Sequence, residues 1–458
     1  MKLSEIAKVT SGGLYGSDLE FQSISTDSRS IEEHELFVAL VGEKFDGHEY
    51  IDAVIARGAC AMIVSRPLAQ DIPHIVVEDT LTALGKIGSA FANATTARLV
   101  ALTGSCGKTT TKEMIRLCLA EHGEVHATRG NLNNHIGVPL TLAELTAEHQ
   151  FGVIEMGASG VGEIDYTVSL TQPEVVLITN ASAAHLEGFG SFENIVKTKG
   201  EIIRASQSDS VVVLNKDDAS FDSWLAMLNG RKLVTFSGSL TSQADVCLKS
   251  KTAIEPLGYQ LLVQVGDQDY EFDFHALGDH MIQNALASLA VVHAMGLDVK
   301  VALQGLTKFH PVKGRLSPVK YEDVTVWDDT YNANPRSVEA AIQTVGECEG
   351  EKWLVLGEMA ELGGGAANAH AQLGRKALNH KFSRVFAIGS YAHCVIECGG
   401  FLGTAYKKTD MDVLISDLLN SIQGGVHILV KGSRSAGMER VIEALKNDFV
   451  QHKNNFKK

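Results

Sequence analysis

The chain has 458 residues, and at about one domain per 150 residues this length predicts roughly three domains. Apolar residues make up 45% and charged residues 21%, as in ordinary globular proteins. The net charge of −15 argues against a general nucleic-acid-binding protein. No stretch approaches the ~18 consecutive apolar residues of a membrane span, and the N-terminus has no secretory signal pattern, so we expect a cytoplasmic protein. Its seven scattered cysteines predict free thiols.

The first 80 residues predict a small α/β unit, because short apolar runs alternate with one segment of helical period. An amphipathic helix over residues 80–96 then connects this unit to the rest of the chain. We place a domain boundary at residues 82/83. The strand candidates are 35–42, 59–65 and 74–79, and the helix candidate is 50–58.

From Arg98 the pattern is apolar strand, glycine turn and helix, repeated, which predicts a parallel sheet with helices on both faces. Residues 244–254 and 259–274 instead alternate with period two around a loop, which predicts a small antiparallel piece. Helical period returns over residues 280–296. The strand candidates of the parallel part are 98–103, 124–128, 151–155, 173–180 and 210–215.

A second alternating unit begins near residue 314, with four apolar strands separated by helical stretches. Those strands are 324–328, 352–357, 384–389 and 426–432. The chain is therefore predicted to be an α/β protein of three domains, at residues 1–82, 83–313 and 314–458.

The segment RLVALTGSCGKTTT, residues 98–111, predicts a phosphate-binding loop. A glycine-rich turn between a strand and a helix directs backbone N–H groups and the positive helix N-terminus at phosphate oxygens, and a lysine adds charge. Thr109 can place its hydroxyl on a bound magnesium ion. The usual first glycine is missing, because Leu102 occupies that position. The alternative is a glycine turn in an α/β domain without a ligand.

Two further groups of polar residues follow buried strands. Glu155 ends the strand FGVIE, and Asn180, His185, Glu187 and Lys199 follow the strand VVLIT. In an open α/β sheet, ligands bind at the carboxyl edge of the strands, and a carboxylate there suits magnesium. The alternatives are a carboxylate that caps the next helix and a histidine on an ordinary loop.

Three other segments are dense in polar groups. The loop 128–141 carries asparagines and a histidine that suit a neutral polar ligand, or that only make turns for themselves. Residues 314–335 place Arg315 near the aspartates 328 and 329, which predicts a site assembled when domains close, with turn capping as the alternative. The stretch STDSR at 25–29 by itself indicates only a turn.

The order and spacing of these motifs resemble those of the Mur ligase superfamily of ATP-dependent amide-bond-forming enzymes, over essentially the whole chain. The superfamily's shortened phosphate loop accounts for the missing glycine. The motifs that carry the resemblance are TDSR, TGSCGKTTTK, GNLNNHIGVP, AHLEGFGS, DDTYNANP, LGEMAELG and VKGSR.

The resemblance implies an ATP-binding site with two magnesium ions. Lys108 would hold the terminal phosphates, Thr109 and Glu155 the first magnesium, and His185 the second. Lys199 matches a lysine that family members carbamylate, which turns an ammonium into a carboxylate-like metal ligand. The implied ATP-binding set is Gly104, Ser105, Cys106, Gly107, Lys108, Thr109, Thr110, Asn284, Arg315 and Asp329. The implied catalytic set is Lys108, His185, Lys199, Arg315 and Asp329.

The resemblance also implies the substrates. Ser28 and Arg29 would contact a UDP-sugar, and Asn133, Asn134 and His135 would lie close to the substrate peptide. Within the superfamily, the motifs are most similar to members that join D-alanyl-D-alanine to UDP-N-acetylmuramoyl-tripeptide through an acyl phosphate, giving ADP, phosphate and a peptidoglycan precursor. We expect a monomer with a small α/β UDP-binding domain, a central P-loop-type ATPase domain and a C-terminal Rossmann-like domain that binds the dipeptide.

Three positions depart from the family's motifs: Thr330 replaces a serine, Glu358 replaces an aspartate, and Met281 replaces a polar residue. The alternatives are a folylpolyglutamate synthetase and a scaffold protein with residual ATP binding. The STDSR domain argues against the first, because that family starts at its ATPase domain. The intact set of Lys108 and the implied metal ligands argues against the second.

Overall fold

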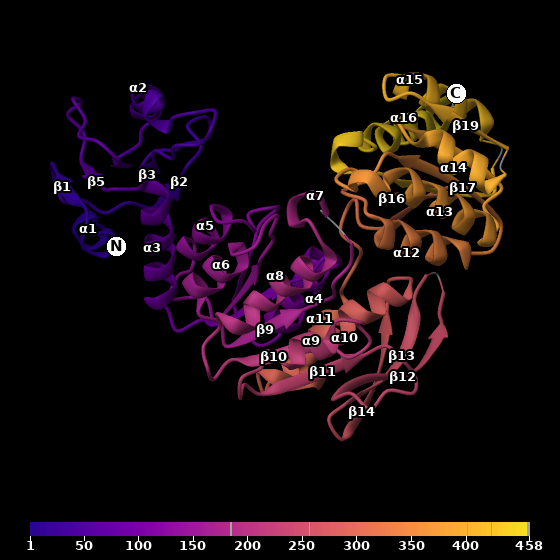
Figure 1. The fold of residues 1–458 in the computed structure, drawn as a ribbon, viewed down its shortest axis with the longest axis horizontal. Coiled ribbons are helices and arrows are strands. Elements are labelled where there is room, and N and C mark those ends of the chain that lie inside the picture. The colour runs from indigo at the N-terminus through magenta and orange to yellow at the C-terminus, as the bar shows by residue number, and fades with distance from the viewer. Residues whose placement is uncertain (184–185, 256, 401, 423, 456–458) are drawn as a thin grey trace.

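The computed structural model contains three β-sheets in succession along the chain, each with helices on both faces (Figure 1). The mixed α/β architecture with mostly parallel sheets confirms the predicted fold class. Within the part of the chain that the structure describes, none of the helices combines the length and apolarity that a bilayer crossing requires. The described residues are 1–183, 186–255, 257–400, 402–422 and 424–455.

The first unit is a five-stranded sheet in the order β1-β5-β4-β3-β2, parallel except for the edge strand β1. Helices α1 and α3 pack on one face of the sheet and α2 on the other. The strands are β1 (Gly13–Tyr15), β2 (Ser23–Ser25), β3 (Glu35–Val38), β4 (Ala61–Val64) and β5 (His74–Val76), and the helices are α1 (Leu3–Thr10), α2 (Ile51–Ala56) and α3 (Thr80–Asn93).

The predicted boundary at 82/83 falls inside α3. Ala83, Leu84 and Ile87 of this helix belong to the apolar core of the first sheet, so the helix is both part of the first unit and its connection to the second. The boundaries at 82/83 and 313/314 stay predictions.

The second unit is a nine-stranded sheet in the order β14-β13-β12-β11-β10-β9-β6-β8-β7. The strands from β7 to β12 pair in parallel, while β12, β13 and β14 form the predicted antiparallel piece. The strands are β6 (Arg98–Thr103), β7 (Val125–Ala127), β8 (Phe151–Glu155), β9 (Val175–Ile178), β10 (Val211–Asn215), β11 (Leu233–Ser237), β12 (Val246–Ala253), β13 (Tyr259–Val265) and β14 (Gln268–Phe274).

Two helical layers cover this sheet. Helices α4, α10 and α11 pack on one face, and α5, α6, α8 and α9 pack on the other. Strand β6 lies between β8 and β9, so the chain leaves β6 toward one side of the sheet and later returns to its other side. Such a switch point is where open α/β sheets bind ligands. The helices are α4 (Lys108–Ala120), α5 (Gly137–Ala143), α6 (Glu163–Thr171), α7 (Leu186–Phe189), α8 (Phe192–Arg204), α9 (Phe221–Leu225), α10 (Asp279–Ala294) and α11 (Val299–Thr307).

The third unit is a six-stranded sheet in the order β15-β16-β20-β17-β18-β19, parallel except for the edge strand β15. Helices α12, α13 and α14 pack on one face and α15 and α16 on the other. The strands are β15 (Ser317–Tyr321), β16 (Val324–Asp329), β17 (Glu351–Gly357), β18 (Arg384–Ile388), β19 (Leu402–Tyr406) and β20 (Val426–Lys431), and the helices are α12 (Pro335–Gly346), α13 (Ala366–Asn379), α14 (Ala392–Gly399), α15 (Met411–Ser421) and α16 (Glu439–Asn455).

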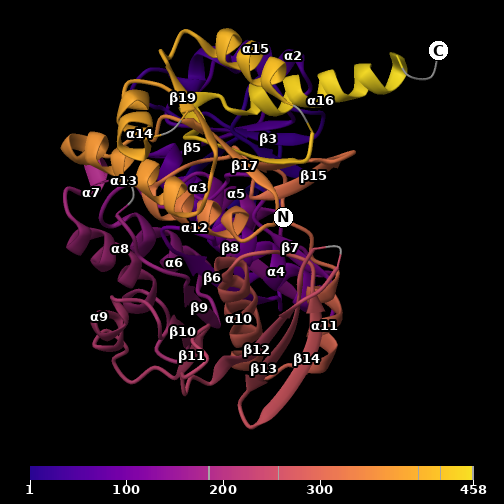
Figure 2. The same cartoon turned by 90° about the vertical axis from the view of Figure 1, so that its right-hand side faces the viewer.

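The third unit contacts the second at the start of α12 and at Arg315. In two perpendicular views, α12 lies on the side of the third unit that faces the central unit (Figure 1, Figure 2). This contact brings residues of the third unit to the carboxyl edge of β6, β8 and β9.

Candidate active site

The predicted phosphate loop connects β6 to α4 in a conformation that depends on glycine. Gly104 has φ +155° and Gly107 has φ +80°, both in the region that L side chains rarely adopt. A Cβ on Gly104 would lie 1.9 Å from Thr179 Oγ1, and a Cβ on Gly107 would lie 2.6 Å from Asn284 Oδ1. The loop therefore lies directly against the end of β9 and against α10, which leaves no space for larger residues.

Side chains that follow β9 hold this loop in place. Asn180 accepts the N–H of Cys106 through Oδ1 and donates to the Cys106 carbonyl through Nδ2, both at 3.0 Å. Ser105 Oγ accepts the N–H of Ser182 at 3.0 Å and donates to its carbonyl at 3.2 Å. Residues 179–182 thus determine how the phosphate loop is positioned.

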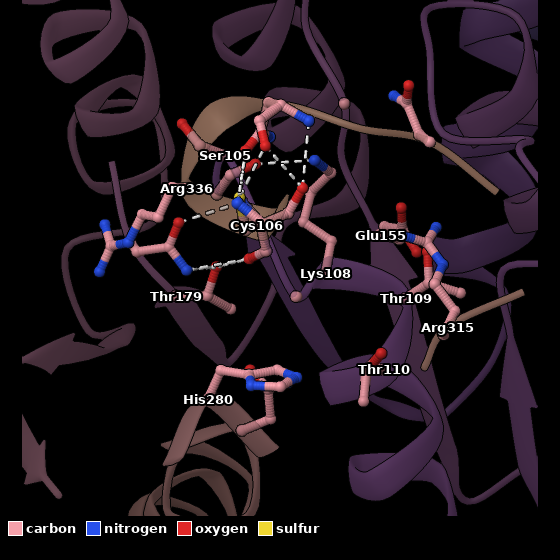
Figure 3. A pocket seen from close by; sticks show the side chains of 18 of the residues that line it. Ser105, Cys106, Lys108, Thr109, Thr110, Glu155, Thr179, His280, Arg315 and Arg336 are labelled. Atoms are coloured by element: carbon pink, nitrogen blue, oxygen red, sulfur yellow. Dashed lines mark hydrogen bonds between the residues drawn. The ribbon is translucent and has the colours of Figure 1, made fainter. Parts of the chain in front are cut away.

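Lys108 is the first residue of α4, and it folds back over the loop. Its Nζ donates to the Gly104 carbonyl at 2.7 Å (Figure 3). Burial of the ammonium lowers the pKa of Lys108, while the nearby Glu155 carboxylate opposes that shift. Together with the N-terminus of α4, this side chain gives the site a positive end suited to phosphate.

Glu155, the last residue of β8, offers a ligand position for a cation. The residue is only 2% exposed. Its Oε1 accepts from Asn133 Nδ2 at 2.8 Å, whereas its buried Oε2 has no hydrogen-bond partner. A buried carboxylate oxygen without a donor is costly unless a cation or a proton satisfies it. These residues fit a magnesium ion, which binds through one or two carboxylates together with substrate phosphates.

The protein side chains by themselves do not form a complete metal-binding site in the described part of the chain. Among residues 1–183, 186–255, 257–400, 402–422 and 424–455, no three His, Cys, Asp or Glu side chains converge on one point. The predicted metal ligand His185 lies outside the described residues.

Lys199, on α8, lines the same cavity. It is 3% exposed, and its Nζ lies 5.7 Å from the centre of the Phe189 ring. Burial, and then the positive charge of Lys108, lower the pKa of Lys199 to about 7, against the opposing effect of Glu163 and Glu201. A substantial fraction of this amine is therefore neutral and nucleophilic near neutral pH.

The third unit contributes a cation to the phosphate loop. Arg315 donates from Nη2 to Thr109 Oγ1 at 3.1 Å, and its guanidinium lies 3.9 Å from the centre of the Tyr331 ring (Figure 3). This stacking fixes the guanidinium beside the hydroxyl that we predicted to be a magnesium ligand.

Asp329 ends β16 and is held by a buried lysine. Its Oδ2 lies 2.6 Å from Lys431 Nζ, and its Oδ1 accepts the Leu316 N–H at 3.1 Å. Burial raises the pKa of Asp329, while Lys431 opposes that shift. Burial, and then the charge of Lys431, lower the pKa of the neighbouring His280 to about 4, so this imidazole is neutral at physiological pH.

These groups line one cavity of about 520 Å³ between the second and third units. Ligand pockets of proteins usually occupy about 300–1,000 Å³, so its size suits a nucleotide. The predicted site residues that line it are Gly104, Ser105, Cys106, Gly107, Lys108, Thr109, Thr110, Asn133, Asn134, Glu155, Lys199, Asn284, Arg315 and Asp329.

Three predicted substrate residues do not line this cavity: Ser28, Arg29 and His135. Arg29 is exposed in the first unit, where its Nε and Nη2 pair with Asp27 at 2.9 and 2.7 Å. Asn134 uses its Oδ1 for the N–H groups of Ile136 and Gly137, as expected of a residue that makes a turn for itself.

Several lining residues were not singled out from the sequence. Tyr331, Asn334 and Lys431 belong to quoted motifs, DDTYNANP and VKGSR, but the spacing did not indicate which members face the site. His280 and Arg336 carry no sequence signal of their own, because each depends on a contact between units.

Comparisons with known proteins find relatives that match all three units of the chain. Three family models match it: "Mur ligase family, catalytic domain" at residues 20–92, "Mur ligase middle domain" at 102–292 and "Mur ligase, glutamate ligase domain" at 314–434. The UDP-N-acetylmuramoyl-tripeptide–D-alanyl-D-alanine ligase of Escherichia coli is 38% identical over 447 residues, which is 97% of this chain and 98% of that protein. Its counterpart in Bacillus subtilis is 32% identical over 97% of this chain and 98% of its own.

Solved structures give the same result. A crystal structure of MurF from Acinetobacter baumannii has a TM-score of 0.89 and 33% identity, and the match covers 96% of this chain and 98% of that one. MurF ligase from Thermotoga maritima, in complex with ADP, has a TM-score of 0.83 and 28% identity, covering 95% and 100%. Matches to all three units, and to relatives that are covered over nearly their whole length, show that the chain belongs to the Mur ligase family.

Proposed function

We propose that this protein joins D-alanyl-D-alanine to UDP-N-acetylmuramoyl-tripeptide at the expense of ATP, giving the UDP-N-acetylmuramoyl-pentapeptide precursor of peptidoglycan. The observation that carries this proposal is the convergence of Lys108, the unpartnered Glu155 oxygen and the buried Lys199 in one cavity, which Arg315 of the third unit closes. The full-length similarity to ligases with this name supports the choice of substrates.

The chemistry needs an activated carboxylate, because a carboxylate has no leaving group for amide formation. Transfer of the γ-phosphoryl group of ATP to the terminal carboxylate of the tripeptide forms an acyl phosphate and ADP. The dipeptide amine then attacks the acyl carbon, and phosphate leaves with its bond electrons while the amine loses a proton.

Charge repulsion is the main barrier that the protein must lower, since the carboxylate and the triphosphate are both anions. Lys108 and the N-terminus of α4 would bind the terminal phosphates, and Arg315 would approach them from the third unit. Thr109 and Glu155 would hold one magnesium ion, with His185 at a second. Bound magnesium would offset the charge of the phosphates and of the incoming carboxylate.

Lys199 is suited to carbamylation. Its neutral amine can attack carbon dioxide, forming an N–C bond and releasing one proton, so that the neutral side chain becomes an anionic one. A pKa of about 7 provides the neutral amine at physiological pH. The resulting carboxylate-like oxygens would face the same cavity as Glu155.

The three units would divide the substrates among them. We propose that residues 1–82, with Ser28 and Arg29, bind the UDP end, and that residues 83–313 bind ATP. Asn133, Asn134 and His135 would lie near the peptide, and residues 314–458 would bind the dipeptide. Asn284 and Asp329 would contact the nucleotide. We propose that the protein acts as a monomer, and ATP and UDP-linked substrates favour the cytoplasm.

The test is phosphate release from ATP by the purified protein with magnesium, bicarbonate, the UDP-tripeptide and D-alanyl-D-alanine, omitting each in turn. We expect release to require both the tripeptide and the dipeptide, with the UDP product gaining the mass of the dipeptide less one water. Phosphate release that does not depend on the dipeptide would contradict the proposed substrates.

A further inference from the structure

The start of α12 contacts the central unit through a cation that the reaction described above does not use. Arg336 Nη1 donates to the Ala181 carbonyl at 2.8 Å and lies 3.6 Å from Asp218 Oδ2. The Arg336 side chain is 51% exposed, whereas that of Asp218 is 2% exposed. A cation of the third unit thus reaches a buried anion of the second.

Asp218 organises the segment that follows β9. Its Oδ2 accepts the Ala181 N–H at 3.0 Å, and its Oδ1 accepts the Ser220 N–H at 2.9 Å. Arg336 and Asp218 therefore both bind Ala181. The arginine donates to its carbonyl, and the aspartate accepts its N–H. Both sides of Ala181 are fixed when the third unit is docked.

The segment held in this way is the one that positions the phosphate loop. Thr179 Oγ1 donates to the Cys106 carbonyl at 2.8 Å, in addition to the two hydrogen bonds between Asn180 and Cys106. A second route is direct, because Asn334, the N-cap residue of α12, places its Nδ2 3.2 Å from Cys106 Sγ. In Figure 3, Arg336 lies on one side of Cys106 while Lys108, Thr109 and Arg315 lie on the other.

We propose that Arg336 is a positioning residue that couples docking of the third unit to the conformation of the phosphate loop, acting through Ala181 and Asp218. When the unit docks, Asn334 covers the Cys106 thiol and Arg336 fixes the segment behind it. When the unit moves away, both contacts are lost together, and the loop is held by the central unit alone. This inference rests on the proposed function only in that the loop binds a nucleotide.

The size of the effect follows from exposure. A half-exposed ion pair contributes little, and the hydrogen bond from a charged donor to a carbonyl contributes more. Arg315 and Asn334 remain as further contacts of the third unit. Loss of Arg336 should therefore shift docking by about fivefold, or about 1 kcal/mol at 1.36 kcal/mol per tenfold, without undocking the unit.

The Cys106 thiol reports docking directly. The full-length protein is treated with N-ethylmaleimide, and the rate of modification at Cys106 is measured by peptide mass spectrometry, which separates it from the other thiols. We expect Cys106 to react about fivefold faster in Arg336→Ala than in the unchanged protein, with Arg336→Lys in between. Arg375→Ala is the matched control, because Arg375 is an exposed arginine on α13 of the same unit; its rate should be unchanged.

Kinetics give an independent readout. Arg336→Ala should lower kcat several-fold while the KM for the UDP-tripeptide, proposed to bind to the first unit, stays the same. Arg336→Lys keeps the charge, so we expect this variant to fold and to show a smaller loss of kcat than Arg336→Ala. Equal Cys106 rates in Arg336→Ala and Arg375→Ala would overturn the coupling. If the unchanged protein lacks ligase activity while the Cys106 rates still differ, the proposed function fails and the coupling stands.

Discussion

Lys108 and Lys199 line the same cavity, and burial has the same effect on both. Burial lowers the pKa of both Lys108 and Lys199, and the charge of Lys108 lowers that of Lys199 further. Burial removes water from both ammonium groups and so destabilises their charged forms. An anion bound between them would offset that cost, so the cavity favours anionic ligands. Strand ends and glycine turns in the sequence indicated many of the residues that line this cavity, while their roles stay predictions. The sequence could not predict that Glu155 Oε2 has no partner, which depends on packing from several elements.

Glu155→Gln tests that unpartnered oxygen. The amide keeps the shape of the side chain but removes its charge, so we expect a higher magnesium concentration for half-maximal phosphate release and activity reduced by about 100-fold. Glu397→Gln is the control, because Glu397 is an exposed glutamate on α14. A magnesium dependence that is unchanged in Glu155→Gln would exclude this carboxylate as a metal ligand.

Carbamylation of Lys199 should depend on pH in a defined direction. Because the pKa of the folded protein's Lys199 is about 7, the amine becomes protonated and unreactive toward carbon dioxide as the pH falls through that value. With carbon-13-labelled bicarbonate, we expect a carbamate NMR signal at about pH 8 that declines toward about pH 6. The signal should be absent in Lys199→Ala. Persistence in that variant, or no decline with pH, would contradict the assignment.

At the scale of secondary-structure elements, the order of the strands in the central sheet brings the residues of the cavity together. Because β6 lies between β8 and β9, the phosphate loop, Glu155 and the Thr179–Ser182 segment meet at one edge. The alternation of apolar runs and helices predicted these strands, since each is buried on both faces. The edge strands β1, β2, β15 and β19 and the interior strand β11 were not predicted, because short or partly exposed strands leave a weak periodic signal.

The buried pair between β16 and β20 should matter for stability. Lys431→Met removes the cation beside Asp329 and leaves a buried carboxylate with one backbone donor. We expect the free energy of unfolding to fall by about 3 kcal/mol, as when one partner of a buried ion pair is removed.

Lys376→Met is the matched control, since Lys376 pairs with Glu339 on the same unit but both side chains are 46% exposed. Its cost should be under about 1 kcal/mol. Urea unfolding of the two variants measures the difference. Equal losses of unfolding free energy in the two variants would show that the buried Lys431–Asp329 pair stabilises the protein no more than an exposed pair does.

At the scale of the whole molecule, function depends on how the units meet. The length of the chain predicted three units, and the alternation of strands and helices predicted their α/β fold. The contact of Arg315 with Thr109 and of Arg336 with Ala181 could not be predicted, because sequence periodicity carries no information on how separate cores dock. The motif DDTYNANP predicted a site between domains, but not that its Asn334 would contact the phosphate loop.

The central claim is that this interdomain cavity activates a carboxylate by phosphoryl transfer from ATP. The most direct measurement uses UDP-tripeptide whose terminal carboxylate is labelled with oxygen-18, together with ATP and D-alanyl-D-alanine. Formation of an acyl phosphate transfers one carboxylate oxygen to phosphorus, so we expect one labelled oxygen in the released phosphate for each amide bond formed. Unlabelled phosphate accompanying pentapeptide formation would contradict the account.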